Sequence, residues 1–246
     1  MSYRNYDEES LDTPDRKYSY DFDLIARKIF LETVSSYISK DSRSKSLEVG
    51  SYDGSMAKLI LGYVNKLTVV EPSPSLAQRV ADIDSKRIEI QVSTIEEYKT
   101  NLLYDNIFLV HTLEHVEDPI RVLKKLKALL APAGKIFIMV PNGNALSRQI
   151  AVAMGLINHN TSVTSAEAKQ GHLRTYVIDT LFAEVRNSGL KVSDHGGIIV
   201  KALANFQFDL ATKHEIVNMD YFRAANQLAK RFPDLSASLY IIAESN

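Results

Sequence analysis

Two carboxylates and two glycines fall within seven residues of this 246-residue chain, at Glu48, Gly50, Asp53 and Gly54. An apolar run precedes them, a helix-like run follows, and the next apolar run ends in a third carboxylate, Glu71. Glycine lets the backbone approach a ligand closely, and a carboxylate at a strand end can accept both hydroxyls of a ribose. The layout is typical of a nucleoside-binding βαβ unit.

The glycine spacing separates two classes of nucleoside cofactor. A dinucleotide fingerprint needs G-x-G-x-x-G so that a pyrophosphate can reach the helix N-terminus, whereas this chain has G-x-x-x-G with Ser51 and Tyr52 inside it. Glu48 and Asp53 would repel a pyrophosphate but suit a cationic sulfonium or ammonium group. The charges therefore favour S-adenosylmethionine over NAD. An ordinary strand–turn–helix corner without a ligand is the alternative.

Apolar runs and Gly/Pro breaks alternate along the rest of the chain in the order of a mostly parallel α/β sheet. The strands are expected at 46–49, 67–70, 88–92, 105–110, 135–140, 191–202 and 237–244. The helices are expected at 22–39, around 59–61, and at 75–83, 120–130, 178–188 and 219–231. Asp21 or Asp23 is expected to cap the first of these helices.

Five segments in this order resemble class I S-adenosylmethionine-dependent methyltransferases of the small-molecule type. They are Leu47-Glu48-Val49-Gly50, Glu71, Ser93-Thr94-Ile95-Glu96, Leu113-Glu114-His115-Val116 with Asp118-Pro119, and Leu130-Ala131-Pro132-Ala133-Gly134. The resemblance spans about residues 44 to 142 and weakens toward the C-terminus. It implies an α/β fold: a Rossmann-like, seven-stranded, mostly parallel sheet of order 3-2-1-4-5-7-6, with an antiparallel last strand and helices on both faces.

The resemblance also implies which residues hold the cofactor, S-adenosyl-L-methionine, and its product S-adenosyl-L-homocysteine. The glycine loop would face the methionine part, Glu71 the ribose, and the turn after the third strand the adenine. Many relatives carry Asp where this chain has Thr94, which weakens a side-chain contact to the adenine amine there. The implied contacts are Glu48, Gly50, Ser51, Asp53, Gly54, Glu71, Pro72, Thr94, Ile95, His111 and Thr112.

The reaction implied is in-line displacement of a methyl group from a sulfonium, in which the protein aligns the reactants and excludes water. A hydroxyl acceptor needs a base, whereas an amine need only arrive unprotonated. His115, His111 and His172 are the candidate bases, because imidazole titrates near neutrality. His172 belongs to a G-H-x-R-x-Y segment that resembles small-molecule methyltransferases. For each histidine, a structural hydrogen-bonding role is the alternative.

His111, Glu114 and His115 also look like the E-x-x-E-H metal segment of some O-methyltransferases, including those that modify RNA ends. The first position departs from that pattern, because His111 stands where an acid should. Mg²⁺ prefers oxygen ligands, which weakens the case for it, although Zn²⁺ would accept histidine. We therefore expect no metal site.

Composition indicates one domain without membrane or nucleic-acid partners. The net charge is −1, the apolar runs are of strand length, and cysteine is absent, which fits a cytoplasmic protein. We expect an N-terminal helical lid (1–43) carrying tyrosines such as Tyr18 and Tyr20, with a surface-packed amphipathic helix as the alternative. A cofactor-binding core (44–142), an acceptor-side insertion (143–177) and the C-terminal part of the sheet (178–246) would follow, in a monomer or homodimer.

The expected acceptor is a small polar molecule, most simply through a hydroxyl of a saccharide or related metabolite. Segments 17–23, 201–207, 221–223 and 231–235 resemble methyltransferases of sugar and surface-polysaccharide pathways. One alternative is an RNA-end methyltransferase that uses a basic patch of Arg121, Lys124, Lys125 and Lys127. Another is a non-catalytic S-adenosylmethionine-binding protein. A nicotinamide dehydrogenase is disfavoured by the missing glycine.

Overall fold

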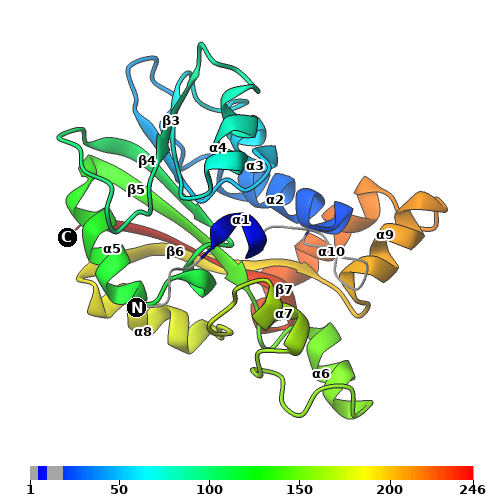
Figure 1. The fold of residues 1–246 in the computed structure, drawn as a ribbon. Helices are drawn as coiled ribbons and strands as arrows, with labels where there is room; N and C mark the ends of the chain where they lie inside the picture. Colours follow the sequence, from blue (N-terminus) through cyan, green and yellow to red (C-terminus); the bar gives the residue numbers. More distant parts are fainter. Residues whose placement is uncertain (1–4, 10–18, 246) are drawn as a thin grey trace.

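A seven-stranded sheet of order β3-β2-β1-β4-β5-β7-β6 forms the centre of the molecule (Figure 1). The computed structural model describes residues 5–9 and 19–245. Neighbouring strands from β3 to β5 are parallel, and β7 is antiparallel to both β5 and β6. The fold expected from the sequence is therefore confirmed. The strands are β1 (Ser46–Val49), β2 (Leu67–Glu71), β3 (Ile88–Val92), β4 (Tyr104–Val110), β5 (Leu130–Pro141), β6 (Leu190–Val200) and β7 (Ser236–Ser245).

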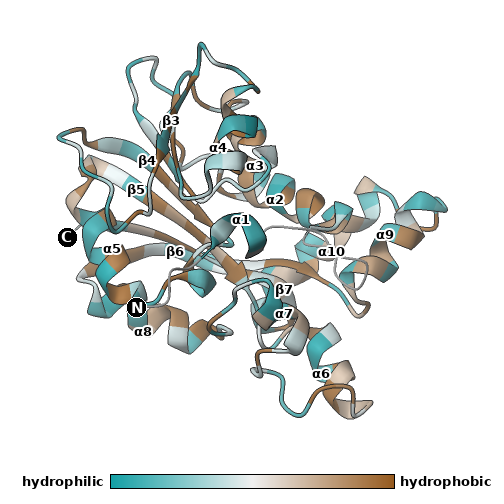
Figure 2. Ribbon diagram, viewed as in Figure 1, coloured by the Kyte–Doolittle hydropathy of each residue, from teal (hydrophilic) through white to brown (hydrophobic). Residues whose placement is uncertain are grey.

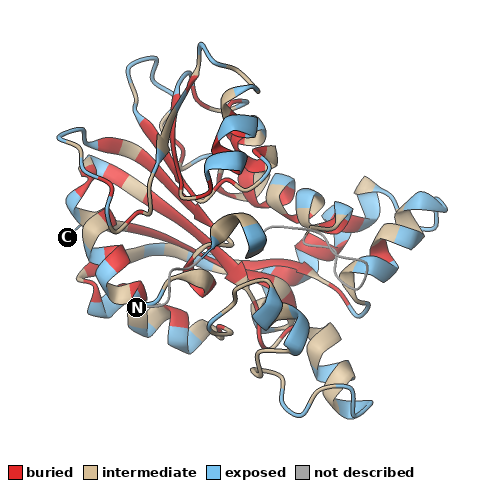
Figure 3. Cartoon of the chain, in the orientation of Figure 1, coloured by how far each residue is buried: buried red, intermediate tan, exposed pale blue. Residues whose placement is uncertain are grey.

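Helices pack on both faces of this sheet and bury two hydrophobic cores. On one face lie α2 (Asp21–Val34), α3 (Ser55–Ile60) and α10 (Met219–Arg231), and on the other lie α5 (Pro119–Ala128) and α8 (Ile178–Asn187). Because side chains alternate along a strand, each central strand feeds both cores, and its sequence is a nearly continuous apolar run. The central strands are accordingly apolar and buried, whereas β3 and the first half of β6, at the two edges of the sheet, are partly exposed. The helices turn polar faces outward (Figures 2 and 3).

The remaining elements are short helices and turns, and one of them, α4 (Pro74–Ala81), packs against β2 and β3 and adds Val80 to the core on the α2 face. None of the helices in the described ranges is long and apolar enough to span a bilayer. These elements are α1 (Tyr6–Glu9), α4 (Pro74–Ala81), the 3₁₀ turn η1 (Leu113–His115), α6 (Leu146–Ala153), α7 (Ser165–Lys169), α9 (Asn205–Lys213) and the 3₁₀ turn η2 (Pro233–Leu235).

Both ends of α2 differ from the sequence-based expectation. The helix ends at Val34 rather than near residue 39. Its first amides, on Asp21 and Phe22, donate to the carboxylate of Asp209 in α9 at 3.1 and 2.9 Å. Asp23 instead accepts the amide of Tyr20 at 2.8 Å. Tyr20 is the N-cap residue, and Asp23 contributes to the cap as its N3 residue. The carboxylate that accepts the first amides comes from α9, a helix far away in sequence that was not expected.

The carboxyl ends of the parallel strands meet at one edge, and the loops that leave them are tied to each other. The Gly50 amide after β1, for example, donates to the Val70 carbonyl of β2 at 2.9 Å. The short helix α1 docks beside them, because the Asp7 carboxylate accepts the hydroxyls of Ser73 and, at 2.7 Å, Ser75. Ligands of open α/β sheets bind at this edge, so a ligand site is expected here.

Candidate active site

A cavity of about 1100 Å³ opens at the carboxyl ends of the strands. Ligand pockets usually enclose roughly 300–1,000 Å³, so this one has room for a cofactor and an acceptor together. Most residues expected from the sequence line it. They are Gly50, Ser51, Glu71, Pro72, Thr94, Ile95, His111, Thr112, His115 and His172.

Gly50 stands at the closest approach between the loop after β1 and the loop after β4. Its φ of +73° is left-handed, and a Cβ atom there would lie 2.9 Å from Thr112 Oγ1. The Thr112 hydroxyl donates to the Val49 carbonyl at 2.8 Å, which fixes this contact. Only glycine meets both the backbone and the packing requirement at this position.

Glu71 joins the loop after β1 to the loop after β2. Its Oε2 accepts the amides of Ser51 and Tyr52 at 2.9 and 3.1 Å, and its Oε1 accepts the Ser73 amide at 3.0 Å. Burial raises the pKa of this carboxyl, while the three amides act to lower it. A carboxylate offers about four lone-pair sites, so Glu71 retains acceptor capacity toward the cavity that it lines.

Three expected cofactor residues lie outside the cavity lining. Glu48 is buried beneath the loop, where the Ser51 hydroxyl donates to its Oε2 at 3.1 Å, and burial raises its pKa to about 8. Asp53 is exposed and accepts the Ser55 amide at 3.0 Å. At Gly54 a Cβ atom would collide with the Ile83 side chain. These residues support the loop through helix capping and packing, roles that the sequence pattern does not distinguish from ligand contact.

The turn after β3 forms another part of the lining. Ile95 is buried with its apolar side chain in the core of the α5 face. The Thr94 hydroxyl already accepts the Glu97 amide at 3.3 Å. The Thr94 hydroxyl is therefore partly engaged within its own turn.

Tyrosines from the N-terminal segment also reach the cavity. Tyr6 of α1 and Tyr20 before α2 both line it. Tyr18, which the lid hypothesis also included, lies outside the described residues.

Arg27 is a cavity residue that the sequence reasoning missed. It extends from α2, where its Nη1 donates to Ser55 Oγ at 3.0 Å. Its Nε is buried, and no hydrogen-bond partner for that atom exists among the described residues. A guanidinium with an unpaired donor in a cavity suits an anionic group such as a carboxylate. Its position depends on the packing of α2 against α3, for which the sequence carries no local signal.

The three candidate bases line the same cavity but differ in environment. His111 has a φ of +51°, and its Nε2 lies 3.3 Å from Ser238 Oγ. Burial holds its pKa well below the usual value, so its imidazole is neutral at pH 7. The rings of His115 and His172 meet edge to face with centroids 4.6 Å apart. Burial also lowers the pKa of His172.

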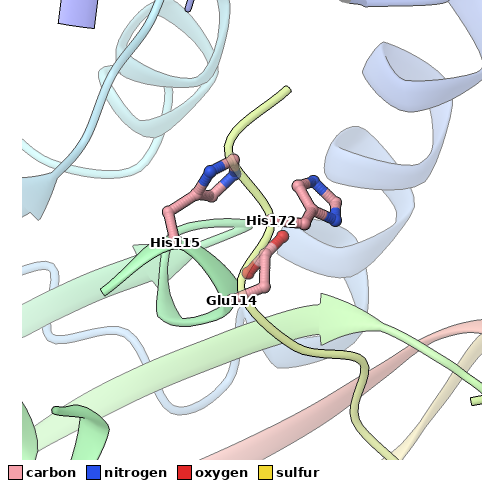
Figure 4. A group of neighbouring side chains, drawn as sticks. All are labelled: Glu114, His115 and His172. Carbon is pink, nitrogen blue, oxygen red and sulfur yellow. The ribbon is translucent and has the colours of Figure 1, made fainter. Parts of the chain in front are cut away.

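Glu114 lies beside the latter two histidines (Figure 4). One donor atom from each of Glu114, His115 and His172 lies within 4.8 Å of the other two. Burial raises the pKa of the Glu114 carboxyl to about 8. His111 is the first residue of the segment that resembles the E-x-x-E-H metal motif, but it is not part of this group.

The G-H-x-R-x-Y segment, which carries His172, is hydrogen-bonded to the backbone of η1 and the residues after it. The Leu173 amide donates to the Glu114 carbonyl at 2.9 Å. The Arg174 guanidinium donates to the carbonyls of Val116 and, at 3.0 Å, Glu117. Arg174 therefore fixes the backbone around the histidines and does not line the cavity itself.

Lys201, after β6, is a second cavity residue that the sequence reasoning missed. It is 8% exposed, and burial lowers its pKa to about 8. Its Nζ donates to the Leu203 carbonyl at 3.0 Å and lies 4.9 Å from the centre of the Phe22 ring. A buried lysine with a lowered pKa in a cavity is a candidate functional residue.

The 143–177 segment contributes to the same cavity through α6, α7 and His172. The Arg148 guanidinium of α6 forms an ion pair with Glu167 of α7 and donates to the Asn160 carbonyl at 2.6 Å. This network holds the segment together although its sequence is weakly patterned.

Comparisons with known proteins agree with this geometry. A family model described as a methyltransferase domain matches residues 15–195. The ubiquinone biosynthesis O-methyltransferase of Xanthomonas axonopodis pv. citri (strain 306) is 22% identical over 78% of this chain and 80% of its own length.

Solved structures share the fold at low identity. The CcbJ methyltransferase from Streptomyces caelestis matches with a TM-score of 0.63 and 13% identity over 98% of each chain. The N-methyltransferase NodS from Bradyrhizobium japonicum WM9, in complex with S-adenosyl-L-homocysteine, matches with a TM-score of 0.55 and 13% identity over 98% of this chain and 99% of NodS. Since the family model covers well over half of the chain, the chain belongs to the methyltransferase domain family and is a class I methyltransferase that uses S-adenosylmethionine.

Proposed function

We propose that this enzyme methylates a hydroxyl oxygen of a small polar acceptor, with saccharides and related metabolites as the first class to test. The observation that carries the proposal is the polar lining of the cavity away from the glycine loop. Its side chains include His111, Ser147, His172, Lys201, Asn205 and Ser238. Such a lining offers hydrogen bonds to several hydroxyl groups at once, as a polyhydroxylated acceptor requires.

The cofactor is proposed to lie along the loops after β1, β2 and β3. The ribose hydroxyls would donate to Glu71, and the adenine would lie against Ile95 and Thr94. The carboxylate of the methionine part would pair with Arg27, whose buried Nε supports this assignment. This arrangement would direct the sulfonium methyl toward His111 and Thr112.

The proposed reaction is a single in-line displacement. The acceptor oxygen forms a bond to the methyl carbon while the bond from that carbon to sulfur breaks, and S-adenosyl-L-homocysteine is the product. The hydroxyl proton passes to an imidazole, for which His111, His115 and His172 are the candidates. A neutral imidazole is the form that can accept it, and burial favours that form at His111 and His172.

Two other classes of acceptor, RNA ends and phenols, are tested alongside saccharides. An RNA end would need a basic surface, but Lys125 and Lys127 donate to the carbonyls of Glu96 and Gly189 at 2.8 and 2.7 Å. Two of the four cations of the expected basic patch are thus engaged within the fold, which disfavours RNA. A phenolic acceptor is included because the relative from Xanthomonas is named for ubiquinone biosynthesis.

The test is S-adenosyl-L-homocysteine formation by the purified enzyme with nucleotide sugars and free saccharides, catechols, simple amines, or short RNA as acceptors. We expect turnover with a hydroxylated small molecule of the first group and no inhibition of that turnover by added RNA. Turnover only with RNA, or only with an amine acceptor, would overturn the proposal. A steep loss of activity with added salt would be the signature of an RNA acceptor.

A further inference from the structure

The carboxylate of Glu114 is buried without a hydrogen-bond partner. The residue is 1% exposed, and neither Oε1 nor Oε2 has a partner among the described residues. Buried polar atoms are almost always hydrogen-bonded, and leaving a buried carboxyl unsatisfied costs free energy. Two such atoms on one side chain indicate that something absent from the polypeptide completes their environment.

Two imidazoles face the same point. A donor atom of Glu114, one of His115 and one of His172 all lie within 4.8 Å of one another (Figure 4). A metal ion with bonds of about 2.1 Å holds its ligand atoms roughly 3–4 Å apart. Small side-chain rotations would therefore bring these three donors to bonding distance.

The backbone on both sides of this group is fixed before any ion arrives. Leu173 and Arg174 bind the carbonyls of Glu114, Val116 and Glu117, so the two segments that carry the histidines cannot separate freely. Glu114 and His115 also share the 3₁₀ turn η1. Pre-positioned ligands of this kind are typical of metal sites rather than of chance clusters.

We propose that Glu114, His115 and His172 bind one divalent transition-metal ion at the wall of the active-site cavity. An imidazole bound to the ion cannot also accept the proton of the acceptor, so with the ion in place His111 is the remaining candidate base. Two imidazoles and one carboxylate suit Zn²⁺, Fe²⁺ or Co²⁺. Mg²⁺ prefers oxygen ligands and is expected to bind poorly. The proposal departs from the expectation that the chain has no metal site, and it differs from the sequence comparison in using His172 instead of His111.

The ion would have an open position, because three protein ligands leave at least one for water or substrate. His115 and His172 line the cavity, so an oxygen of the acceptor can occupy that position. This last step rests on the proposed function, and it narrows the acceptor to molecules with a metal-binding oxygen, such as a pair of adjacent hydroxyls. Ion binding itself requires neither cofactor nor acceptor.

Cobalt titration of the metal-stripped protein tests the site directly, in the absence of S-adenosylmethionine and acceptor. The readouts are the visible absorption of protein-bound Co²⁺ and calorimetric titration with Co²⁺, Zn²⁺ and Mg²⁺. The site variants are Glu114→Gln and His172→Asn. The matched controls are His111→Asn, in the same cavity, and His195→Asn, on the exposed surface of β6.

We expect one Co²⁺ per chain, displacement by Zn²⁺ and no competition from Mg²⁺ at equal concentration. Each site variant should weaken Co²⁺ binding at least tenfold, while both controls bind as the unmodified protein does. No stoichiometric Co²⁺ or Zn²⁺ binding, or equal loss in His111→Asn, would overturn the assignment. Circular dichroism of each variant distinguishes a lost ligand from a lost fold, and His172→Asn decides the question if Glu114→Gln does not fold. A failed acceptor screen with intact Co²⁺ binding would refute only the proposed acceptor.

Discussion

Gly50 and Thr112 pack so closely that a Cβ atom on residue 50 would lie 2.9 Å from Thr112 Oγ1. The hydroxyl cannot move away easily, because it donates to the Val49 carbonyl at 2.8 Å. This contact holds the cofactor loop after β1 against the loop after β4, which carries the histidines. The two halves of the active site therefore share one rigid boundary.

Gly50→Ala is expected to destabilise the fold by more than Gly155→Ala does. Both glycines have left-handed φ values, +73° and +72°, but nothing lies within 4 Å of a Cβ atom on residue 155. The control should lose about 1 kcal/mol for the backbone alone, and Gly50→Ala about 2–4 kcal/mol with the collision added. Urea unfolding measures both. Equal losses would show that the contact with Thr112 relaxes without cost.

Glu71→Ala should weaken S-adenosyl-L-homocysteine binding by about 1–3 kcal/mol, because charge-assisted hydrogen bonds to the ribose are lost. Binding of 5′-methylthioadenosine, which keeps the ribose but lacks the amino-acid group, should be weakened by the same amount. Glu89→Ala, an exposed carboxylate on β3, is the matched control. Calorimetric titration provides the affinities, and an unchanged affinity in Glu71→Ala would refute the ribose assignment.

Arg27→Ala should lower the affinity for only one of the two ligands whose affinity Glu71→Ala lowers equally. We expect S-adenosyl-L-homocysteine to bind about tenfold or more weakly, because its carboxylate loses a charged partner, while 5′-methylthioadenosine binds within about twofold of its original affinity. Lys28→Ala, at the exposed neighbouring position, controls for charge. Parallel weakening of both ligands would mean that Arg27 supports the pocket without contacting the carboxylate.

Glu48 is expected to make the stability of the protein fall as pH rises. Its pKa is raised by burial from about 4.5 to about 8, so between these values the folded state holds a proton that the unfolded state has lost. The free energy of unfolding therefore decreases from pH 4.5 to 8 and levels off above the folded-state pKa. Glu48→Gln should be nearly neutral at pH 5 and stabilising at pH 8, by an amount on the order of a few kcal/mol.

Urea unfolding at pH 5, 6.5 and 8 tests this pH dependence, with the exposed Glu97→Gln as control. The unfolding free energy of Glu48→Gln should still decrease with rising pH, in part because burial also raises the pKa of Glu114 to about 8. A Glu48→Gln curve parallel to that of the unmodified protein would show that Glu48 is ionised throughout.

Much of the fold could be predicted because its strands are short apolar runs separated by Gly and Pro. The helix of α10, at Met219–Arg231, has the bounds expected from its amphipathic pattern. The start of β5 at Leu130 rather than near residue 135 was not predictable in this way. There Leu130 pairs with Tyr104 of β4 and Lys135 pairs with Asn106, with a shift of register between the two pairs. Such pairing depends on the neighbouring strand.

The cavity lining was predictable where residues follow strand ends, as at Gly50 and Glu71. Local pattern could not distinguish loop-supporting residues such as Asp53 from cavity residues. It also missed Arg27 and Lys201, because each reaches the cavity through packing between elements far apart in sequence. For the same reason the partner of Glu114 and His115 was sought at His111, close in sequence, while the fold supplies His172.

Calorimetric titration of the purified protein with S-adenosylmethionine, S-adenosyl-L-homocysteine and NAD measures directly whether this cavity binds the proposed cofactor. We predict micromolar binding of the first two at one per chain, loss of that affinity in Glu71→Ala, and no binding of NAD. Binding of NAD in preference to the other two, or binding of S-adenosyl-L-homocysteine that neither Glu71→Ala nor Arg27→Ala weakens, would contradict the account.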